Sequence, residues 1–222
     1  MIYIMINLYL IRHGRQDSLL CNVNAALSEE GVEQARHLRE RLRGYQIDAI
    51  YSSDLIRAKQ TAQIINEALQ LPLEIREDLK EISFGLMEGN TDDYNEEYFA
   101  EFKMEQKKLA EDIPYPGGEN GTSVYERAMP VIQEIVQSGK QNIVVVTHGG
   151  TIRVLLAALF GKNQAKRFLF GLSLENTGIT QLSYQPEIDR FYLERFNDYA
   201  HLEADPRLKR DYLVRQSGKD PE

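Results

Sequence analysis

Short apolar runs alternate with longer amphipathic stretches along this chain, and the alternation predicts strands and helices in turn. The apolar runs predict strands over residues 2–11, 47–51, 142–147, 177–184 and 190–197. The run 142–147 contains four consecutive apolar, β-branched residues, which is typical of a central parallel strand. We expect the last two strands to form a hairpin at an edge of the sheet.

Apolar residues at helical spacing fill the segments between these strands. We expect amphipathic helices over about 29–43, 55–69, 123–138 and 151–160. Ser28 and the run Ser52-Ser53-Asp54 are predicted N-caps of the first two helices, and Ser123 to Glu126 has the pattern of a capping box. Pro130 predicts a kink or a late start in the third helix.

This order of elements predicts an α/β fold. Strands that alternate with helices favour a three-layer αβα sandwich, with a mainly parallel central sheet and helices on both faces. We expect residues 1–222 to form one domain, with a small acidic cap inserted at about 90–121. A chain of this length can bury roughly 70% of its unfolded surface without a disulfide or metal.

The net charge limits the kinds of binding partner to expect, and the cysteine content indicates the cellular compartment. A net charge of −8 argues against nucleic acid or an anionic membrane as the main partner. The first apolar run is too short to cross a membrane, and no Lys or Arg precedes it as in a secretory signal. The single cysteine, Cys21, suits a reducing cytoplasm. Whether translation starts at Met1 or Met5 stays open.

The first strand ends in Arg12-His13-Gly14. In open α/β sheets, ligands bind at the carboxyl ends of the strands. An imidazole can act as a nucleophile, and a guanidinium beside it favours phosphate or carboxylate. Gly14 permits a tight exit turn and close approach of the backbone to a ligand. This tripeptide therefore predicts an anion site at the sheet edge.

A second tripeptide repeats this arrangement. His148-Gly149-Gly150 follows the strand 142–147 and opens a helix, whose N-terminal N–H groups and dipole favour an anion. Arg57 falls in the first turn of its helix, off the apolar stripe, so we expect it to point away from the core near the carboxyl edge of the preceding strand. Glu81 and Glu88 both lie near a glycine turn and are candidate acids.

These residues fall into four ordered blocks, and the chain resembles the histidine phosphatase superfamily, also called the phosphoglycerate mutase-like family. The blocks are Leu10 to Gly14; Ser53-Asp54-Leu55 with Arg57-Ala58 and Thr61-Ala62; Glu81 with Phe84-Gly85 and Glu88-Gly89; and Val146 to Gly150. A weaker fifth block is Glu175 to Thr180. The resemblance implies a phosphoglycerate mutase-like fold.

The resemblance also implies roles. His13 takes the phosphoryl group, and Arg12, Arg57 and His148 bind its oxygens together with the helix start at Gly149. Glu81 protonates the leaving oxygen and later helps water to attack phosphohistidine, while Glu88 is expected to order the glycine turn. No metal and no cofactor are implied.

Elementary chemistry supports these roles. Phosphoryl transfer needs an in-line nucleophile and positive charge around the equatorial oxygens, which two guanidiniums and an imidazolium supply. His13 must be unprotonated, whereas His148 acts best as a cation or N–H donor. The leaving oxygen needs a proton, so we expect an activity optimum at mildly acidic to neutral pH.

The loop after the nucleophile departs from the family pattern. Gln16 stands where Ser or Thr is usual, and Leu19 stands where many members have Asn. Asn22 or Asn24 could approach the phosphate instead, and Arg15 could add a cation at the rim. Mutases resemble one another closely in this loop, so the departures weaken a mutase reading.

We therefore expect a cytoplasmic, metal-independent phosphatase that hydrolyses a small phosphorylated metabolite through phosphohistidine. The alternatives are a phosphoglycerate mutase and a non-catalytic phospholigand-binding protein on the same fold. His37 and His201 are expected at the surface, the pair Asp92-Asp93 at a solvated helix start, and Cys21 outside the chemistry. The physiological substrate and the oligomeric state stay open.

Overall fold

A six-stranded mixed sheet forms the centre of the computed structural model, which describes residues 4–171 and 173–210. The strands are β1 (Ile6–Arg12), β2 (Ala49–Ser52), β3 (Leu73–Ile75), β4 (Asn142–Thr147), β5 (Ile179–Gln185) and β6 (Arg190–Asp198). Their order is β3-β2-β4-β1-β5-β6, and the first four run parallel while β5 and β6 form an antiparallel edge hairpin. The short strand β3 was not predicted.

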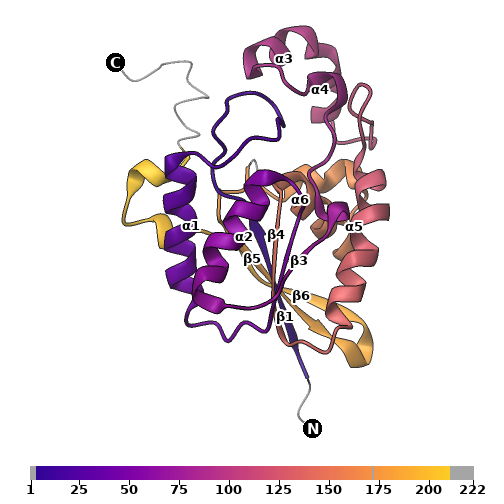
Figure 1. The fold of residues 1–222 in the computed structure, drawn as a ribbon. Helices are drawn as coiled ribbons and strands as arrows, with labels where there is room; N and C mark the ends of the chain where they lie inside the picture. Colours follow the sequence, from indigo (N-terminus) through magenta and orange to yellow (C-terminus); the bar gives the residue numbers. More distant parts are fainter. Residues whose placement is uncertain (1–3, 172, 211–222) are drawn as a thin grey trace.

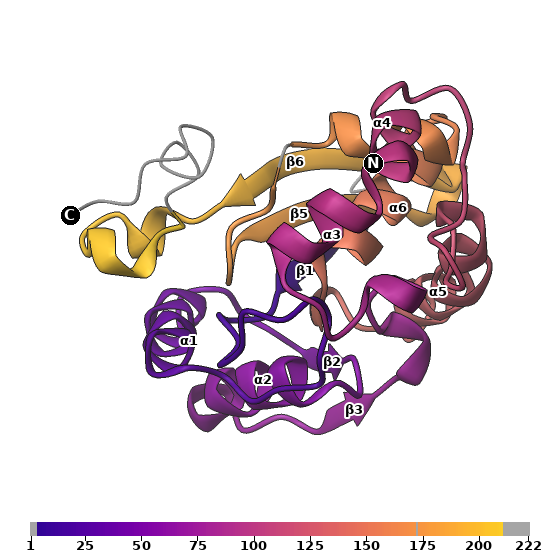
Figure 2. The same cartoon turned by 90° about the horizontal axis from the view of Figure 1, so that it is seen from above.

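Helices cover both faces of this sheet, which confirms the three-layer α/β prediction (Figures 1 and 2). The α-helices of the described residues are α1 (Glu29–Leu42), α2 (Ile56–Leu69), α3 (Asp92–Tyr98), α4 (Ala100–Lys107), α5 (Gly121–Val136) and α6 (Gly149–Leu159). Helices α1 and α2 pack on one face, and α5 and α6 on the other. In the described part of the chain, no helix is long and apolar enough to span a membrane.

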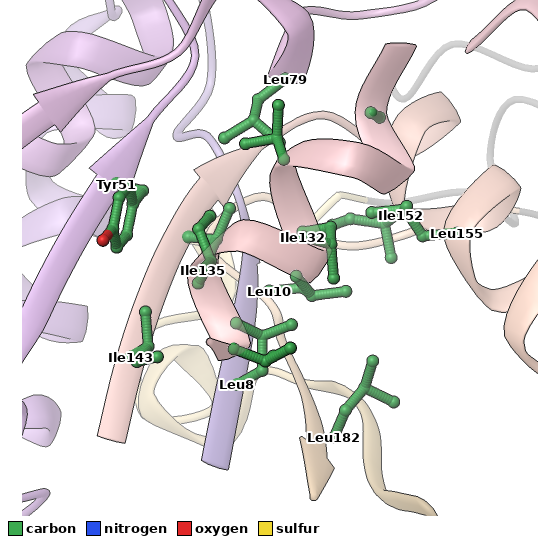
Figure 3. Packing of buried hydrophobic residues seen from close by; sticks show 14 of the residues in the cluster. Leu8, Leu10, Tyr51, Leu79, Ile132, Ile135, Ile143, Ile152, Leu155 and Leu182 are labelled. Atoms are coloured by element: carbon green, nitrogen blue, oxygen red, sulfur yellow. The ribbon is translucent and has the colours of Figure 1, made fainter. Parts of the chain in front are cut away.

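Strand β1 shows how the sequence builds both layers. Its successive side chains point to opposite faces, and all four central ones are buried. Leu8 and Leu10 pack with α5 and α6, as Figure 3 shows, whereas Tyr9 and Ile11 pack with α1 and α2. A strand that is apolar on both faces fits only in the middle of such a sandwich.

Two predicted N-caps are wrong. Helix α2 begins at Ile56, and its N-cap residue makes no side-chain cap; Asn24, from the loop between β1 and α1, accepts from the Ile56 N–H at 2.9 Å instead. Helix α5 begins at Gly121, capped by the side chain of Asn120 rather than by a Ser123 box, and Pro130 lies inside it. Ser28 caps α1 as predicted.

Two segments lie around the carboxyl ends of the parallel strands. Helices α3 and α4, within the predicted cap, lie beyond this end of the sheet in Figure 1. The chain after Asp205 was predicted to be a surface tail, but Leu208 is buried against α1, and its carbonyl accepts from Gln34 at 2.6 Å. The rest of that tail, 211–222, and the start at Met1 lie outside the described residues.

Candidate active site

The adjacent parallel strands β1 and β4 bring the two predicted histidines together. Arg12 is in register with Thr147, and the His13 N–H donates to the Thr147 carbonyl at 3.0 Å. His13 and His148 therefore leave neighbouring strands at the same edge, with ring centroids 5.0 Å apart. Both side chains are buried.

Hydrogen bonds fix the tautomer of His13. Its Nδ1 lies 2.7 Å from the Gly14 carbonyl, which can only accept, so Nδ1 carries the proton. Arg57 Nε donates to His13 Nε2 at 3.1 Å, so Nε2 presents its lone pair. Gly14 is held in turn, because its N–H donates to Thr61 Oγ1 at 3.0 Å. An unprotonated Nε2 is the form that a nucleophilic imidazole requires.

Arg57 lies at the predicted edge but not in the predicted environment. We expected it to point away from the core, yet only 2% of its surface is exposed. The loop after the first strand folds over it, and the guanidinium donates to the Val23 carbonyl at 3.0 Å and to Asn22 Oδ1 at 2.8 Å. Asn22 thus reaches the site through Arg57, whereas Asn24 caps α2 instead.

Arg12 lies on the other side of the nucleophile. Its guanidinium donates to the Leu174 carbonyl, and its buried Nε has no hydrogen-bond partner among the described residues. Gly149, the first residue of α6, packs beside it, since a Cβ there would lie 3.7 Å from Arg12 Nε. Arg12 and Gly149, two of the predicted phosphate-binding residues, are therefore in contact.

His148 is oriented by Ser53, a residue that we had assigned only a capping role. His148 Nε2 and Ser53 Oγ are 2.8 Å apart, and both residues are fully buried. Nδ1 of His148 has no hydrogen-bond partner in the described chain. Ser53 directly follows β2, which pairs with β4, so strand order could have placed it beside the end of β4.

Both histidines are held neutral. Burial, followed by the charges of Arg57 and Arg12, lowers the pKa of His13 well below its ordinary value. Burial and then the neighbouring His13, Arg57 and Arg12 lower the pKa of His148 in the same direction. We had expected the two to differ in protonation, but the same buried, cationic surroundings act on both.

Glu81 caps the N-terminus of α6. Its carboxylate accepts from the Gly150 N–H and the Thr151 N–H, each at 3.1 Å. Gly150 makes this approach possible, because a Cβ at that position would lie 2.4 Å from Glu81 Oε1. Glu88 instead binds Asn22 Nδ2 and the Phe84 N–H, as expected for a residue that orders the glycine turn.

A cavity of about 180 Å³ opens beside Arg12 and Glu81. Its wall also includes Gly149 and Gly150, the guanidinium groups of two further arginines, and several aromatic rings. Its other lining residues are Ile82, Phe84, Tyr115, Arg153, Arg167, Phe168, Ser173 and Leu174. Arg153 donates to the Phe170 and Gly171 carbonyls, while Arg167 pairs with Asp112 at 2.7 Å.

The remaining singled-out residues lie apart from this chemistry, with one correction. His201 was expected at the surface, but it bonds Thr177 Oγ1 at 3.0 Å, and burial lowers its pKa to about 4. Burial raises the pKa of Cys21 to about 11, so its thiol is not reactive at neutral pH. Asp92 and Asp93 stand exposed in the first turn of α3.

Gln16, Arg15 and His37 make contacts away from the two active-site histidines. Gln16 donates to the carbonyls of Ser18 and Leu20 within its own loop, and Arg15 donates to the Lys209 carbonyl. His37 lies near Glu33 on α1 and is partly exposed. Among the described residues, no group of three or more His, Cys, Asp or Glu side chains is placed to hold a metal ion.

Comparison with known proteins agrees with this fold. The family model of the histidine phosphatase superfamily (branch 1) matches residues 8–199. The chain therefore belongs to the histidine phosphatase superfamily.

Named relatives are moderately similar over most of their length. Phosphoserine phosphatase 1 of Hydrogenobacter thermophilus is 32% identical over 177 residues, covering 75% of this chain and 82% of that protein. The probable phosphoglycerate mutase GpmB of Salmonella choleraesuis is 28% identical over 212 residues, covering 90% and 96%.

Solved structures are similar to the same degree. Mycobacterial glucosyl-3-phosphoglycerate phosphatase matches with a TM-score of 0.78 and 29% identity, covering 87% of this chain and 99% of that one. A phosphoserine phosphatase mutant of Entamoeba histolytica, in complex with phosphoserine, matches with a TM-score of 0.76 and 28% identity, covering 89% and 99%.

Proposed function

We propose that this protein hydrolyses small phosphomonoesters through a phosphohistidine on His13. The chain is a phosphoric monoester hydrolase of the histidine phosphatase type. The observation that carries the proposed mechanism is the state of His13: the Gly14 carbonyl holds the proton on Nδ1, and Nε2 presents a lone pair at the base of the site. The lowered pKa of His13 keeps that lone pair available at neutral pH.

In the first step, His13 Nε2 attacks phosphorus and the bond from phosphorus to the ester oxygen breaks. The electron pair of that bond goes to the leaving oxygen, which takes a proton from the Glu81 carboxylic acid. Arg57 exchanges its bond to Nε2 for one to a phosphoryl oxygen, and Arg12 and the α6 N-terminus at Gly149 bind the others. Positive groups placed in advance stabilise charge without reorganising.

In the second step, water attacks phosphorus and the N–P bond breaks. Glu81, now a carboxylate, accepts a proton from that water, and the electron pair returns to His13 Nε2. Inorganic phosphate leaves. The ring centroids of His148 and His13 are 5.0 Å apart. A dianionic phosphoryl group bound there would raise the pKa of His148 from its lowered value. His148 would then donate an N–H to a phosphoryl oxygen.

The proposed substrate is a small phosphorylated metabolite. An in-line displacement puts the leaving group opposite His13, and the cavity beside Glu81 is suited to receive it. Its volume of about 180 Å³ is below the roughly 300–1,000 Å³ of sites for drug-sized ligands. The guanidinium of Arg153 in its wall favours a leaving group with a carboxylate, as in the phosphoserine named for one relative, whereas the charge of Arg167 is paired with Asp112.

Phosphoglycerate mutase is the second candidate, favoured by the relatives named GpmB. A mutase returns the phosphoryl group to a hydroxy acid instead of to water. Phosphoglycerate turnover that depends on added bisphosphoglycerate, with little release of phosphate, would establish the mutase.

We also infer one domain over residues 1–222 with a cap at about 90–121, and a cytoplasmic location that suits the single cysteine.

The testing experiment is hydrolysis of p-nitrophenyl phosphate in EDTA from pH 5 to 9. We expect turnover by the wild type and a loss of at least about 1,000-fold in His13→Ala, because the covalent step is removed. His37→Ala is the matched control, since its ring is partly exposed on α1. Equal rates in wild type and His13→Ala would refute the nucleophile.

A further inference from the structure

A second cavity of about 180 Å³, called here the cap cavity, lies against helices α3 and α4. Helix α4 contributes Phe102 and Lys103 to its wall. The cavity beside Arg12 and Glu81, proposed above to receive the leaving group, is called the leaving-group cavity. The two have the same volume, but the described groups proposed to carry out the reaction line the leaving-group cavity and not the cap cavity.

Two aromatic side chains form a wall that both cavities share. Of the described residues, only Phe84 and Tyr115 line the leaving-group cavity as well as the cap cavity. Their rings are in edge-to-face contact, with centroids 4.7 Å apart. Phe102, which lines the cap cavity alone, extends this aromatic group, since its ring centroid is 5.3 Å from that of Tyr115. The pair of Phe84 and Tyr115 therefore separates the two cavities.

The backbone segments that carry these two rings are bonded to each other. The Leu86 N–H donates to the Pro116 carbonyl at 2.8 Å, and the Glu119 N–H donates to the Ser83 carbonyl at 2.9 Å. Gly85 permits this close approach, because a Cβ at that position would lie 2.2 Å from the Pro116 oxygen. The aromatic pair is thus held on two segments that cannot move apart without breaking these bonds.

The charged groups of the cap cavity make it a poor site for a second anion. Lys103 Nζ is paired with Glu96 at 2.7 Å. Asp92 adds a negative charge to the wall. Burial, followed by the charge of Asp92, raises the pKa of the Cys21 thiol to about 11, so this thiol is neutral. With Phe102 beside the shared aromatic wall, the cap cavity has room for an uncharged ring rather than for another phosphate.

We propose that Phe84 and Tyr115 set the upper size limit of the leaving group, because they close the leaving-group cavity toward the cap cavity. This inference rests on the proposed function, since it concerns the ester that His13 attacks. With the aromatic pair in place, the leaving group has about 180 Å³, which suits a serine-sized or single-ring group. The two cavities joined would reach the lower end of the roughly 300–1,000 Å³ range of sites for drug-sized ligands.

The test compares p-nitrophenyl phosphate with 4-methylumbelliferyl phosphate. Both are aryl esters whose phenolates leave readily, but the second leaving group has two fused rings instead of one. We expect the wild type to have the higher kcat/KM for the smaller ester. Phe84→Ala opens the shared wall, so the ratio of kcat/KM for the larger ester to that for the smaller should rise about tenfold or more, as for a change of fit in an apolar pocket. Phe84→Leu, which preserves more of the apolar packing, should give a smaller rise.

Phe102→Ala is the matched control, because it removes an identical ring from the cap cavity without opening the shared wall. Its ratio should equal that of the wild type, and a rise as large as in Phe84→Ala would overturn the inference by pointing to a general loosening of the cap. A wild type that hydrolyses both esters equally well also overturns it. If both Phe84 variants melt cooperatively and keep the wild-type ratio while the wild type hydrolyses p-nitrophenyl phosphate, this inference alone fails. If the wild type hydrolyses neither ester, the proposed function fails and this inference with it.

Discussion

Gly150→Ala isolates the position of the proposed acid without changing any charged group. A Cβ at Gly150 would lie 2.4 Å from Glu81 Oε1 and 2.8 Å from Ile82 Cγ2. Ordinary van der Waals contact begins at 3.4 Å, so the carboxylate must retreat by about 1 Å. That shift disturbs its bonds to the Gly150 and Thr151 N–H groups, which are already 3.1 Å long.

The magnitude follows from what this displacement does to proton transfer. A misplacement of about 1 Å can cost roughly 100-fold in rate, and general acid catalysis contributes about 100- to 10,000-fold. We therefore expect kcat to fall about 100-fold for an alkyl phosphomonoester, whose alkoxide leaves poorly without a proton. The loss should be smaller for p-nitrophenyl phosphate, because p-nitrophenolate leaves readily.

The assay compares kcat for the two esters in wild type, Gly150→Ala and Glu81→Gln. Binding of inorganic phosphate, measured separately, should change little in Gly150→Ala, since His13 and Arg57 stay in place. Gly149→Ala is the comparison variant, because a Cβ there meets nothing nearer than 3.7 Å. We expect it to lose far less activity than Gly150→Ala.

The ratio between the two substrates decides the outcome. If Gly150→Ala lowers both rates equally, the displaced group does not protonate the leaving oxygen. If Gly150→Ala keeps full activity on the alkyl ester while its melting temperature is unchanged, the steric argument is wrong. The first result would remove Glu81 from the role of general acid, and the second would show that a Cβ at Gly150 does not displace its carboxylate.

Two further predictions concern charge. Arg57→Lys keeps the charge but loses the planar fork that contacts His13, Val23 and Asn22, so kcat should fall by about 100- to 1,000-fold; a loss below about threefold would contradict it. His13, His148 and His201 have lowered pKa values in the folded protein. Below pH 6.5, the ordinary histidine pKa, the unfolded chain therefore binds more protons than the folded protein does. Stability is then complete above that pH and falls as pH decreases, by up to about 1.4 kcal/mol per pH unit for each histidine. Urea denaturation at pH 7, 6 and 5 checks this, His201→Asn should reduce the dependence, and equal stability at all three pH values would refute it.

Strand β4 shows what the sequence could predict well. Its bounds, Asn142–Thr147, match the prediction, because an apolar β-branched run fits only a buried central strand. The two histidines follow their strands directly, so a parallel sheet was enough to place them at one edge. The three-layer fold was predicted for the same reason.

Arg57 shows what periodicity alone missed. The helical pattern correctly put it off the apolar stripe of α2, but the covering loop supplies the Val23 carbonyl and the Asn22 side chain that bury it. The misplaced N-cap of α2 has a similar cause, since its first N–H is bound by Asn24 from a distant loop. Contacts between segments far apart in sequence leave no local pattern.

The pairing of β1 with β4 also determines when the site can form during synthesis. The side chains of Asn7 and Asn142 are hydrogen-bonded across 135 residues of sequence. At about 5–20 residues per second, a ribosome needs on the order of ten seconds to make that intervening chain. Throughout that interval β1 has two apolar faces and two unpaired edges. The nucleophile is therefore synthesised early, but its site assembles late, and a chaperone that shields β1 would act before any catalysis is possible.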